Sequence, residues 1–291
     1  MLEANVLEAY RTAGSIAAKI REEAKKIISE GAPLIKICET LEKKIIKEGG
    51  RLAFPLNISI NDIAAHYTSP PNDKSKIPPG ALVKVDIGVH IDGFIADTAL
   101  SISLGKSGVE LVKASESALE NILKIVKHGV KSNQIGETIE KTIKEFGFKP
   151  ISNLTGHLLD RYNLHAGKSI PNIKTLTGFT LKEGEVYAIE PFATTGIGIV
   201  EDSKYFYIYR MPDQKTSTPF LSYIAHEFKT LPFAARWLVS RFPKAQELIK
   251  RFAVNGAIQT YPVLVEKGRG IVSQAEHTLI VKKNGCEATS I

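Results

Sequence analysis

The stretch ALVKVDIGVHIDGFIADTALSISLG, residues 81–105, decides the fold. Its β-branched residues and the turn-forming pair Asp92-Gly93 predict a β-hairpin. A symmetric hairpin centred immediately before Asp92 would place Asp86 directly opposite Asp97, with Cβ atoms about 5 Å apart. Two like charges so placed are destabilising unless something neutralises them, and a divalent cation would do so. A β-bulge would change this register, and in the alternative interpretation one of the aspartates lies at the surface of an edge strand.

The segments on either side of this hairpin repeat one pattern. Apolar residues at helical spacing predict helices over residues 4–30, 33–47, 109–127 and 134–146. Ser132 and Asn133 precede the last of these helices as candidate caps. Extended segments are predicted at 51–60, 148–157, 185–196 and 270–281. Two helices followed by strands therefore occur twice, which indicates an α/β protein whose two related halves pack into one sheet.

Residues 210–260 break this pattern. Prolines separate short apolar stretches there, which predicts three or four short helices. We expect this segment to be a helical insertion within the second half of the chain. Its bulky side chains are expected to form a small core of their own, and they are Phe220, Leu221, Tyr223, Phe228 and Trp237.

Composition and charge narrow the class of protein. The chain has 291 residues, 43% hydrophobic and 24% charged, as is ordinary for a globular protein with a large core. Its two cysteines, Cys38 and Cys286, are far apart, so we expect no disulfide framework and a reducing compartment. No apolar run long enough for a membrane span and no signal-peptide core is present. The net charge of +7 comes from scattered lysines, which favours a solvated surface over specific nucleic-acid binding. A soluble, cytoplasmic protein is therefore expected.

Further acid and imidazole groups occur in apolar surroundings. Glu190 lies in VYAIEPF, Glu276 lies in IVSQAEHTLIV, and His157 ends the extended segment that contains TGH. Carboxylates inside such strands are costly to bury without a partner. Singly, each residue could be a hydrogen-bonded structural group. Together with His165 they offer the carboxylate and imidazole ligands that suit Mn, Fe, Co or Zn. There is no CxxC pair for a thiolate zinc site, no GxSxG nucleophile motif, and the string GIGIV at 196–200 lacks the spacing of a phosphate loop.

Five ordered motifs, spread through nearly the whole chain, carry a family resemblance. They are LAFPLNISINDIAAHYTSPPND at 52–73, VKVDIGVHIDGFIADTA at 83–99, NLTGHLLDRYNLHAGKSIPN at 153–172, GEVYAIEPFATTGIG at 184–198 and SQAEHTLIV at 273–281. With them the chain resembles the type II methionine aminopeptidases, in an archaeal-like form without the eukaryotic N-terminal extension. The resemblance implies the pita-bread fold, a pseudo-symmetric curved antiparallel sheet covered by helices. It also implies one catalytic domain over residues 1–291, in which the segment at about 210–260 matches the insertion of type II enzymes.

The same resemblance assigns a metal centre. Five residues match the family's ligands for two divalent metal ions, Co, Mn, Fe or Zn, and they are Asp86, Asp97, His157, Glu190 and Glu276. Asp97 and Glu276 would bridge the two ions, Asp86 would complete one, and His157 with Glu190 would complete the other. One ion would also hold the free α-amine of the substrate.

The resemblance further implies roles around the metals. Glu190 would move the proton of the attacking water, His165 would stabilise the oxyanion, and His66 would contact the scissile amide or the second residue. Phe54 and Leu164 match the lining of the pocket for the methionine side chain.

The expected reaction is hydrolytic removal of an N-terminal initiator methionine when the second residue is small and uncharged. The partner would be a peptide or nascent chain that begins with Met, with transient proximity to the ribosome, and the enzyme would act as a monomer. Two alternatives remain open. One is a pita-bread peptidase that cleaves Xaa-Pro bonds, although such enzymes usually carry an additional N-terminal domain. The other is a non-catalytic pita-bread binding protein, although such proteins lose metal ligands and all five are present here.

Overall fold

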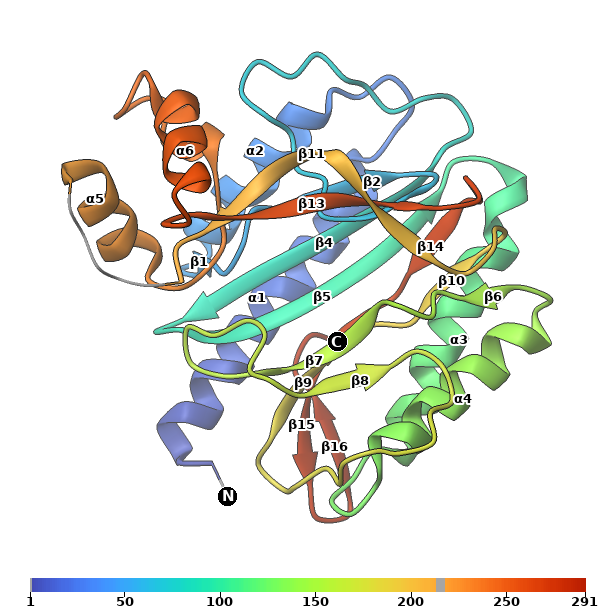
Figure 1. Ribbon diagram of the computed structural model, residues 1–291. Helices are drawn as coiled ribbons and strands as arrows, with labels where there is room; N and C mark the ends of the chain where they lie inside the picture. Colours follow the sequence, from blue (N-terminus) through green and yellow to red (C-terminus); the bar gives the residue numbers. More distant parts are fainter. Residues whose placement is uncertain (1, 213–217) are drawn as a thin grey trace.

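The computed structural model describes residues 2–212 and 218–291 and shows a mixed α/β protein (Figure 1). Helices in the first half are α1 (Ala4–Ile27) and α2 (Leu34–Lys47), and in the second half α3 (Val109–Ile125) and α4 (Ser132–Glu145). The first half contains strands β1 (Arg51–Leu52), β2 (Asn57–Ile60), β3 (Ile63–Ala65), β4 (Leu82–Ile91) and β5 (Phe94–Ser103), followed by the 3-10 turn η1 (Lys106–Gly108).

The second half begins its strands after α4. They are β6 (Lys149–Pro150), β7 (Thr155–Leu159), β8 (Ser169–Pro171), β9 (Val186–Ile189), β10 (Phe192–Thr194), β11 (Val200–Arg210), β12 (Phe233–Ala234), β13 (Gln259–Glu266), β14 (Val272–Gln274), β15 (His277–Lys282) and β16 (Gly285–Ala288). Among the described residues the strands of both halves together fall into four hydrogen-bonded groups, so the single sheet expected from the sequence is interrupted.

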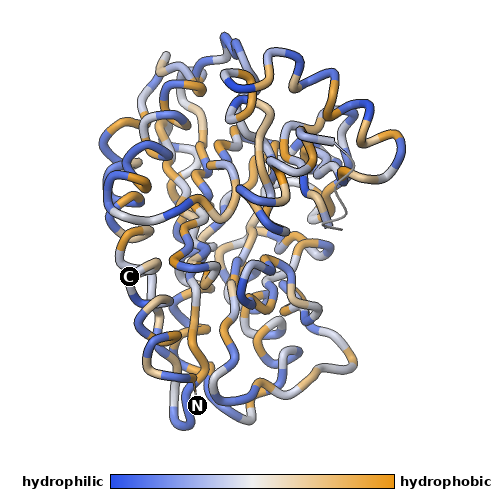
Figure 2. Tube along the Cα trace, turned by 90° about the vertical axis from the view of Figure 1, so that its left-hand side faces the viewer, coloured by the Kyte–Doolittle hydropathy of each residue, from blue (hydrophilic) through white to orange (hydrophobic). Residues whose placement is uncertain are grey.

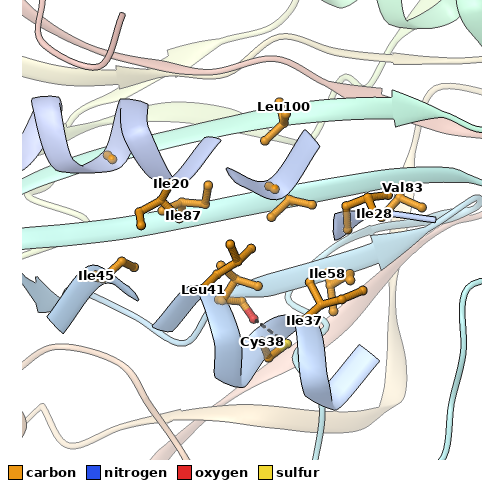
Figure 3. Close-up of a cluster of buried hydrophobic side chains, with 14 of the residues drawn as sticks. Ile20, Ile28, Ile37, Cys38, Leu41, Ile45, Ile58, Val83, Ile87 and Leu100 are labelled. Carbon is orange, nitrogen blue, oxygen red and sulfur yellow. Dashed lines mark hydrogen bonds between the residues drawn. The ribbon is translucent and has the colours of Figure 1, made fainter. Parts of the chain in front are cut away.

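The long hairpin β4–β5 organises the first half. Alternate residues of β4 point to opposite faces, and the odd-numbered ones, Val83, Val85, Ile87 and Val89, are fully buried in the core cluster that contains α1 and α2. Figure 3 shows Ile87 of the strand beside Ile20 of α1, and Val83 farther along the strand beside Ile28. The even-numbered residues, among them Asp86, therefore face the other side, toward the second half of the chain.

The register of this hairpin corrects the one predicted from the sequence. Asp92 and Gly93 have φ values of 50° and 90°, as a type I′ turn requires, and they form the whole two-residue loop. Asp97 therefore pairs with Gly88, and Asp86 pairs with Ala99. The aspartates are diagonal neighbours and do not lie directly opposite each other. Because the register differs from the expected one by two residues, both side chains still lie on one face.

The start of α4 also differs from the prediction. Ser132 and Asn133 are inside the helix and do not cap it, because the N-cap residue is Lys131. The Oε1 atom of Gln134 accepts a hydrogen bond from the backbone nitrogen of Lys131 at 2.9 Å. The Oγ atom of Ser132 instead accepts one from the backbone nitrogen of Phe179 at 3.2 Å, which ties the helix to the loop before β9.

The segment at about 210–260 lies between two long paired strands, β11 and β13. It contains α5 (Pro219–Phe228), the 3-10 turn η2 (Ala235–Trp237) and α6 (Ala245–Val254). Residues 213–217 of the predicted insertion lie outside the described residues. The helices pack around an apolar cluster separate from the other cores, which includes the five bulky residues named above, Phe220, Leu221, Tyr223, Phe228 and Trp237. In Figure 1 these helices lie to one side of the main body.

A short backbone bridge is among the contacts that join the two halves. Ala99 in β5 and Glu276, between β14 and β15, form an isolated antiparallel bridge, with N···O distances of 3.4 and 3.2 Å.

Short hydrophobic and hydrophilic stretches alternate along the trace in Figure 2. No helix in residues 2–212 and 218–291 is both long and apolar enough to cross a membrane.

Candidate metal centre

One cavity of about 410 Å³ gathers all the site residues expected from the sequence. They come from both halves of the chain, and they are Phe54, His66, Asp86, Asp97, His157, Leu164, His165, Glu190 and Glu276. The sequence therefore predicted residues that the fold brings to a single place, although His66 and Glu276 are separated by most of the chain.

The strands aim the acidic groups into this cavity. Asp86 and Asp97 come from the inward face of the β4–β5 hairpin. Glu276 is held beside them by its bridge to Ala99, which is also the pairing partner of Asp86. His157 in β7 reaches the same place because its strand pairs with β9, and Glu190 directly follows β9.

Distances between these groups match a cluster of metal ligands. The Nε2 atom of His157 lies 3.6 Å from Oδ2 of Asp97 and 3.6 Å from Oε1 of Glu190. Ligand atoms of Asp97, His157 and Glu276 all lie within 4.8 Å of one another. Asp97, His157 and Glu276 are buried. Such spacing allows several of these side chains to share one ion.

The electrostatics show why a cation fits here. Burial raises the pKa of the Asp86 carboxyl to about 7. Burial, together with repulsion from neighbouring carboxylates, holds the pKa values of Asp97, Glu190 and Glu276 well above their usual range. Within residues 2–212 and 218–291, the buried atoms Oδ1 of Asp86 and Oδ1 of Asp97 have no hydrogen-bond partner. Four carboxylates in one place, of which Asp97 and Glu276 are buried and the other two are partly buried, are unfavourable unless positive charge joins them. Oxygen and imidazole ligands together suit divalent Mn, Fe, Co or Zn.

Hydrogen bonds from three residues that the sequence analysis did not single out hold the acidic residues, one through the carboxylates and two through the backbone. Nε2 of Gln274 lies 3.2 Å from Oε2 of Glu276 and 3.5 Å from Oε2 of Glu190. The hydroxyl of Thr278 accepts from the backbone nitrogen of Asp97 at 2.7 Å and donates to its carbonyl oxygen at 2.8 Å. The hydroxyl of Thr98 donates to the carbonyl oxygen of Glu276 at 2.7 Å. Gln274 and Thr278 lie within the quoted motif SQAEHTLIV, but only the fold reveals whom they contact.

The two other histidines stand at the rim of the acidic cluster. The His165 ring lies 4.4 Å from the His157 ring and 6.3 Å from Tyr261, measured between centroids. Burial lowers the pKa of His165 to about 4, with smaller contributions from His66 and Arg210, so its imidazole is neutral. A neutral imidazole has one N–H group to donate.

His66 has a defined tautomer. Its Nδ1 lies 3.2 Å from the carbonyl oxygen of Pro262, which can only accept, so Nδ1 carries the hydrogen. Burial lowers the pKa of this side chain, and the neutral ring therefore presents Nε2 as an acceptor. Its φ of 63° is unusual for a residue other than glycine. The strained backbone turns this side chain into the cavity.

Apolar side chains form the remaining wall. The Phe54 ring covers Gly88, where a Cβ atom would approach within 2.3 Å of its Cε1 atom. The glycine opposite Asp97 thus leaves room for an aromatic ring beside the carboxylates. Leu164 and Phe192 also line the cavity, as do Ile208 and Pro232 from the segment around the insertion.

Comparisons with known proteins agree with this arrangement. Residues 8–282 match the model of metallopeptidase family M24. A methionine aminopeptidase of Methanothermobacter thermautotrophicus is 44% identical, with 97% of each chain covered. The structure of a thermophilic Arx1 superposes with a TM-score of 0.87 and 22% identity over 99% of this chain and 91% of that one. A methionine aminopeptidase structure from Thermotoga maritima gives a TM-score of 0.74 and 21% identity over 99% and 98%. At these identities the two structures show the fold alone, and the predicted pita-bread fold is confirmed.

Proposed function

The chain belongs to metallopeptidase family M24, and from that premise we propose that the cluster around Asp97 is the catalytic metal centre of its aminopeptidase activity. The protein is a metal-dependent enzyme that removes N-terminal methionine, since curated methionine aminopeptidases match it over nearly its full length. The observation that carries the site assignment is the single cavity that holds four carboxylates and His157. A non-catalytic binding protein would have no need to bury such a cluster.

We infer that five residues hold two divalent ions, Co, Mn, Fe or Zn. Asp97 and Glu276 would be shared between the ions, Asp86 would complete one site, and His157 with Glu190 would complete the other. The equal distances from His157 to Asp97 and Glu190 support this grouping. Bound ions of this kind lower the pKa of a coordinated water, so that hydroxide is available near neutral pH.

The side chains of the protein would guide the remaining chemistry. Glu190 can accept the proton of the water and pass it to the amine that leaves. The N–H group of His165 can donate to the carbonyl oxygen of the substrate as negative charge develops on it. His66 presents Nε2 as an acceptor, which suits the N–H group of the scissile amide or of the second residue. Both imidazoles are kept neutral by burial, so neither adds a positive charge beside the ions.

The shape of the cavity supports the choice of substrate. Phe54 and Leu164 offer an apolar wall for a methionine side chain, and the polarizable thioether packs well against an aromatic ring. The family resemblance implies that only a small, uncharged second residue is accepted. We therefore propose that the second residue must be small and uncharged.

We further propose that residues 1–291 form one catalytic domain and that the segment at about 210–260 is its type II insertion. The substrates would be peptides and nascent chains that begin with methionine. The enzyme would encounter them in the cytoplasm, in transient proximity to the ribosome, and would act as a monomer. The near-complete coverage of curated relatives supports the single domain.

One assay separates the possible activities. Protein loaded with Mn or Co is given a Met-Gly peptide and, separately, a Leu-Pro peptide, and free amino acid is measured. We expect release of methionine alone. Release of leucine would favour a peptidase for Xaa-Pro bonds, and no release from either peptide would favour a binding protein. Metal analysis of protein purified without added metal would give the identity and number of the ions.

A further inference from the structure

A second cavity lies between the main body and the helical insertion. It encloses about 460 Å³, slightly more than the cavity of the metal centre, and the two cavities share no lining residue. Its walls come from α2, from β1, from the end of β4, and from α5 and η2. Nothing in the proposed reaction uses these side chains, so the cavity needs its own explanation.

One wall of this cavity is a rigid buried network. Oε1 of Glu42 accepts a hydrogen bond from the backbone nitrogen of Leu56 at 3.0 Å and also pairs with Arg236. Oε2 of Glu42 accepts from Nε1 of Trp237 at 2.9 Å. Arg236 additionally donates to the hydroxyl of Thr68 at 2.8 Å. The hydrogen bond from Trp237 to Glu42 fixes the position of the indole ring. Because the charges of Glu42 and Arg236 already neutralise each other, other groups must recognise a ligand.

His90 supplies an unused donor in this cavity. The side chain lines the cavity and only 6% of the residue is exposed. Its Nδ1 accepts a hydrogen bond from the backbone nitrogen of Gly93 at 3.1 Å, so the neutral ring carries its hydrogen on Nε2. Burial and the charge of Arg51 lower the pKa of His90 to about 4, which keeps the ring neutral. Within the described part of the chain, no acceptor lies within hydrogen-bond distance of Nε2. Nε2 of His90 is not among the fully buried side-chain nitrogens that lack a partner, so it is open to the cavity, where a ligand can accept its hydrogen.

Charges of both signs surround the mouth of the cavity. Arg51 and Lys43 are cations, and Glu227 and Glu39 are carboxylates. Arg51 and Glu227 approach each other only to 3.9 Å, and the side chain of Arg51 is 67% exposed, so their pairing is loose. Such a pair remains available to a ligand with two opposite charges.

Apolar groups complete the walls. Leu52 lies next to Arg51 on β1, while Phe228 at the end of α5 packs against Trp237 with ring centroids 5.7 Å apart. Ile46 and Tyr223 extend this surface toward the mouth. The cavity therefore combines an aromatic wall, one inward donor and a loose pair of opposite charges.

We propose that this second cavity binds a free α-amino acid with a large apolar side chain. The carboxylate accepts a hydrogen bond from Nε2 of His90 and faces Arg51. The ammonium group faces Glu227, and the side chain packs against Leu52, Phe228 and Trp237. The reaction of the enzyme releases one molecule of this class, so L-methionine is the natural probe, with L-leucine as a second one.

Trp237 makes the proposal directly measurable. It is the single tryptophan of the chain and lies in the wall of this cavity, outside the cavity of the metal centre. We expect its fluorescence to change saturably as L-methionine is added up to about 10 mM, tenfold above the roughly 1 mM that marks weak specific binding. N-acetyl-methionine lacks the ammonium charge and methionine methyl ester lacks the carboxylate. Each should bind at least tenfold more weakly than L-methionine.

Two substitutions at one position isolate the donor. The amide oxygen of His90→Asn can replace Nδ1 and keep the bond to Gly93, but nothing remains at the position of Nε2. His90→Gln instead offers an N–H group near that position. We expect His90→Asn to lose binding and His90→Gln to retain part of it. Arg51→Gln alters an exposed side chain that packing does not constrain, and it should weaken binding several-fold even if the His90 variants fold poorly.

The outcomes are distinct from those of the catalytic assay. Release of methionine from a Met-Gly peptide is measured in the same preparations, and the variants should retain it because His90 and Arg51 do not line the cavity of the metal centre. The proposal is overturned if no apolar amino acid changes the fluorescence at 10 mM. It is equally overturned if His90→Asn and Arg51→Gln both titrate with the midpoint of the unaltered protein, because methionine would then bind elsewhere. A failure of the catalytic proposal would leave this titration readable.

Discussion

Substitution of Gly88 tests whether the β4–β5 hairpin determines the position of Phe54 in the proposed methionine pocket. A Cβ atom at this position would lie 2.3 Å from Cε1 and 2.4 Å from Cδ1 of Phe54, whereas ordinary contacts begin at 3.4 Å. In Gly88→Ala the aromatic ring must therefore move by about 1 Å. Phe54 is only 5% exposed, so it has little free space to enter other than the cavity that it lines.

Two magnitudes follow for Gly88→Ala. Overpacking of this kind typically costs about 1–3 kcal/mol of folding free energy, which urea unfolding would measure. Displacing a group that positions the substrate by about 1 Å can cost on the order of 100-fold in rate, so kcat/KM for a Met-Gly peptide should fall by about that factor. The metal content should stay unchanged, because Gly88 contributes no side-chain ligand.

A second substitution and a control make this test specific. Phe54→Val removes the ring atoms that collide with the new methyl group, so adding Gly88→Ala to it should cost much less than in the unaltered protein. Gly285→Ala is the control, since a Cβ atom there would meet nothing within 4 Å. If Gly88→Ala kept both its stability and its kcat/KM, or if its effect were the same with and without Phe54, the reasoning would be wrong.

Three further predictions concern other parts of the structure. Asp97→Ala should abolish or strongly weaken metal binding at both positions. Calorimetric titration with Mn measures this, and binding of two ions with unchanged affinity would contradict the proposed bridge. His165→Ala and His66→Ala should keep their metals, and loss of the oxyanion donor in His165→Ala should cost roughly 100- to 1000-fold in kcat; full kcat in His165→Ala on metal-loaded enzyme would exclude the oxyanion role. Glu266 accepts hydrogen bonds from the backbone nitrogens of Ile197, Gly198 and Gly270, and these bonds hold the pKa of its carboxyl below the usual value despite burial. Its stabilising contribution is then present above the unfolded pKa of about 4.3 and is lost as pH falls through the folded pKa. Urea unfolding should show the largest difference between the unaltered protein and Glu266→Gln at neutral pH and a shrinking one in acid, and a difference independent of pH would refute this role.

The hairpin illustrates what the sequence could and could not predict. Local composition identified the strands and the turn, because Asp-Gly pairs favour the positive φ values that a two-residue loop needs. The exact pairing depended on placing the loop correctly, and an error of one residue at its centre changed the partner of Asp97 by two positions. The acidic residues nevertheless stayed on one face, since side chains alternate with a period of two. The error in the predicted register therefore did not change which face of the hairpin carries the candidate ligands.

Contacts between distant segments were harder to predict. Gln274 and Thr278 support the acidic residues through bonds that span much of the chain, and no local pattern distinguishes such residues from ordinary polar ones. The caps expected at Ser132 and Asn133 failed for a similar reason. The Ser132 hydroxyl found a partner in Phe179, far along the chain, which outweighed the local preference for capping.

The bridge between Ala99 and Glu276 has a consequence for how the enzyme becomes active during synthesis. The hairpin can form early, because its partners are close in sequence, whereas Asp97 and Thr278 meet across 181 residues. A chain that has left the ribosome only as far as β13 holds Asp86 and Asp97 but has neither Glu276 nor the strand that carries Thr278. Four of the five proposed ligands are then present, but Glu276, one of the two proposed to be shared between the ions, is missing. Binding of two ions by the proposed ligand set would therefore be complete only after the last strands, β14 and β15, have joined the hairpin.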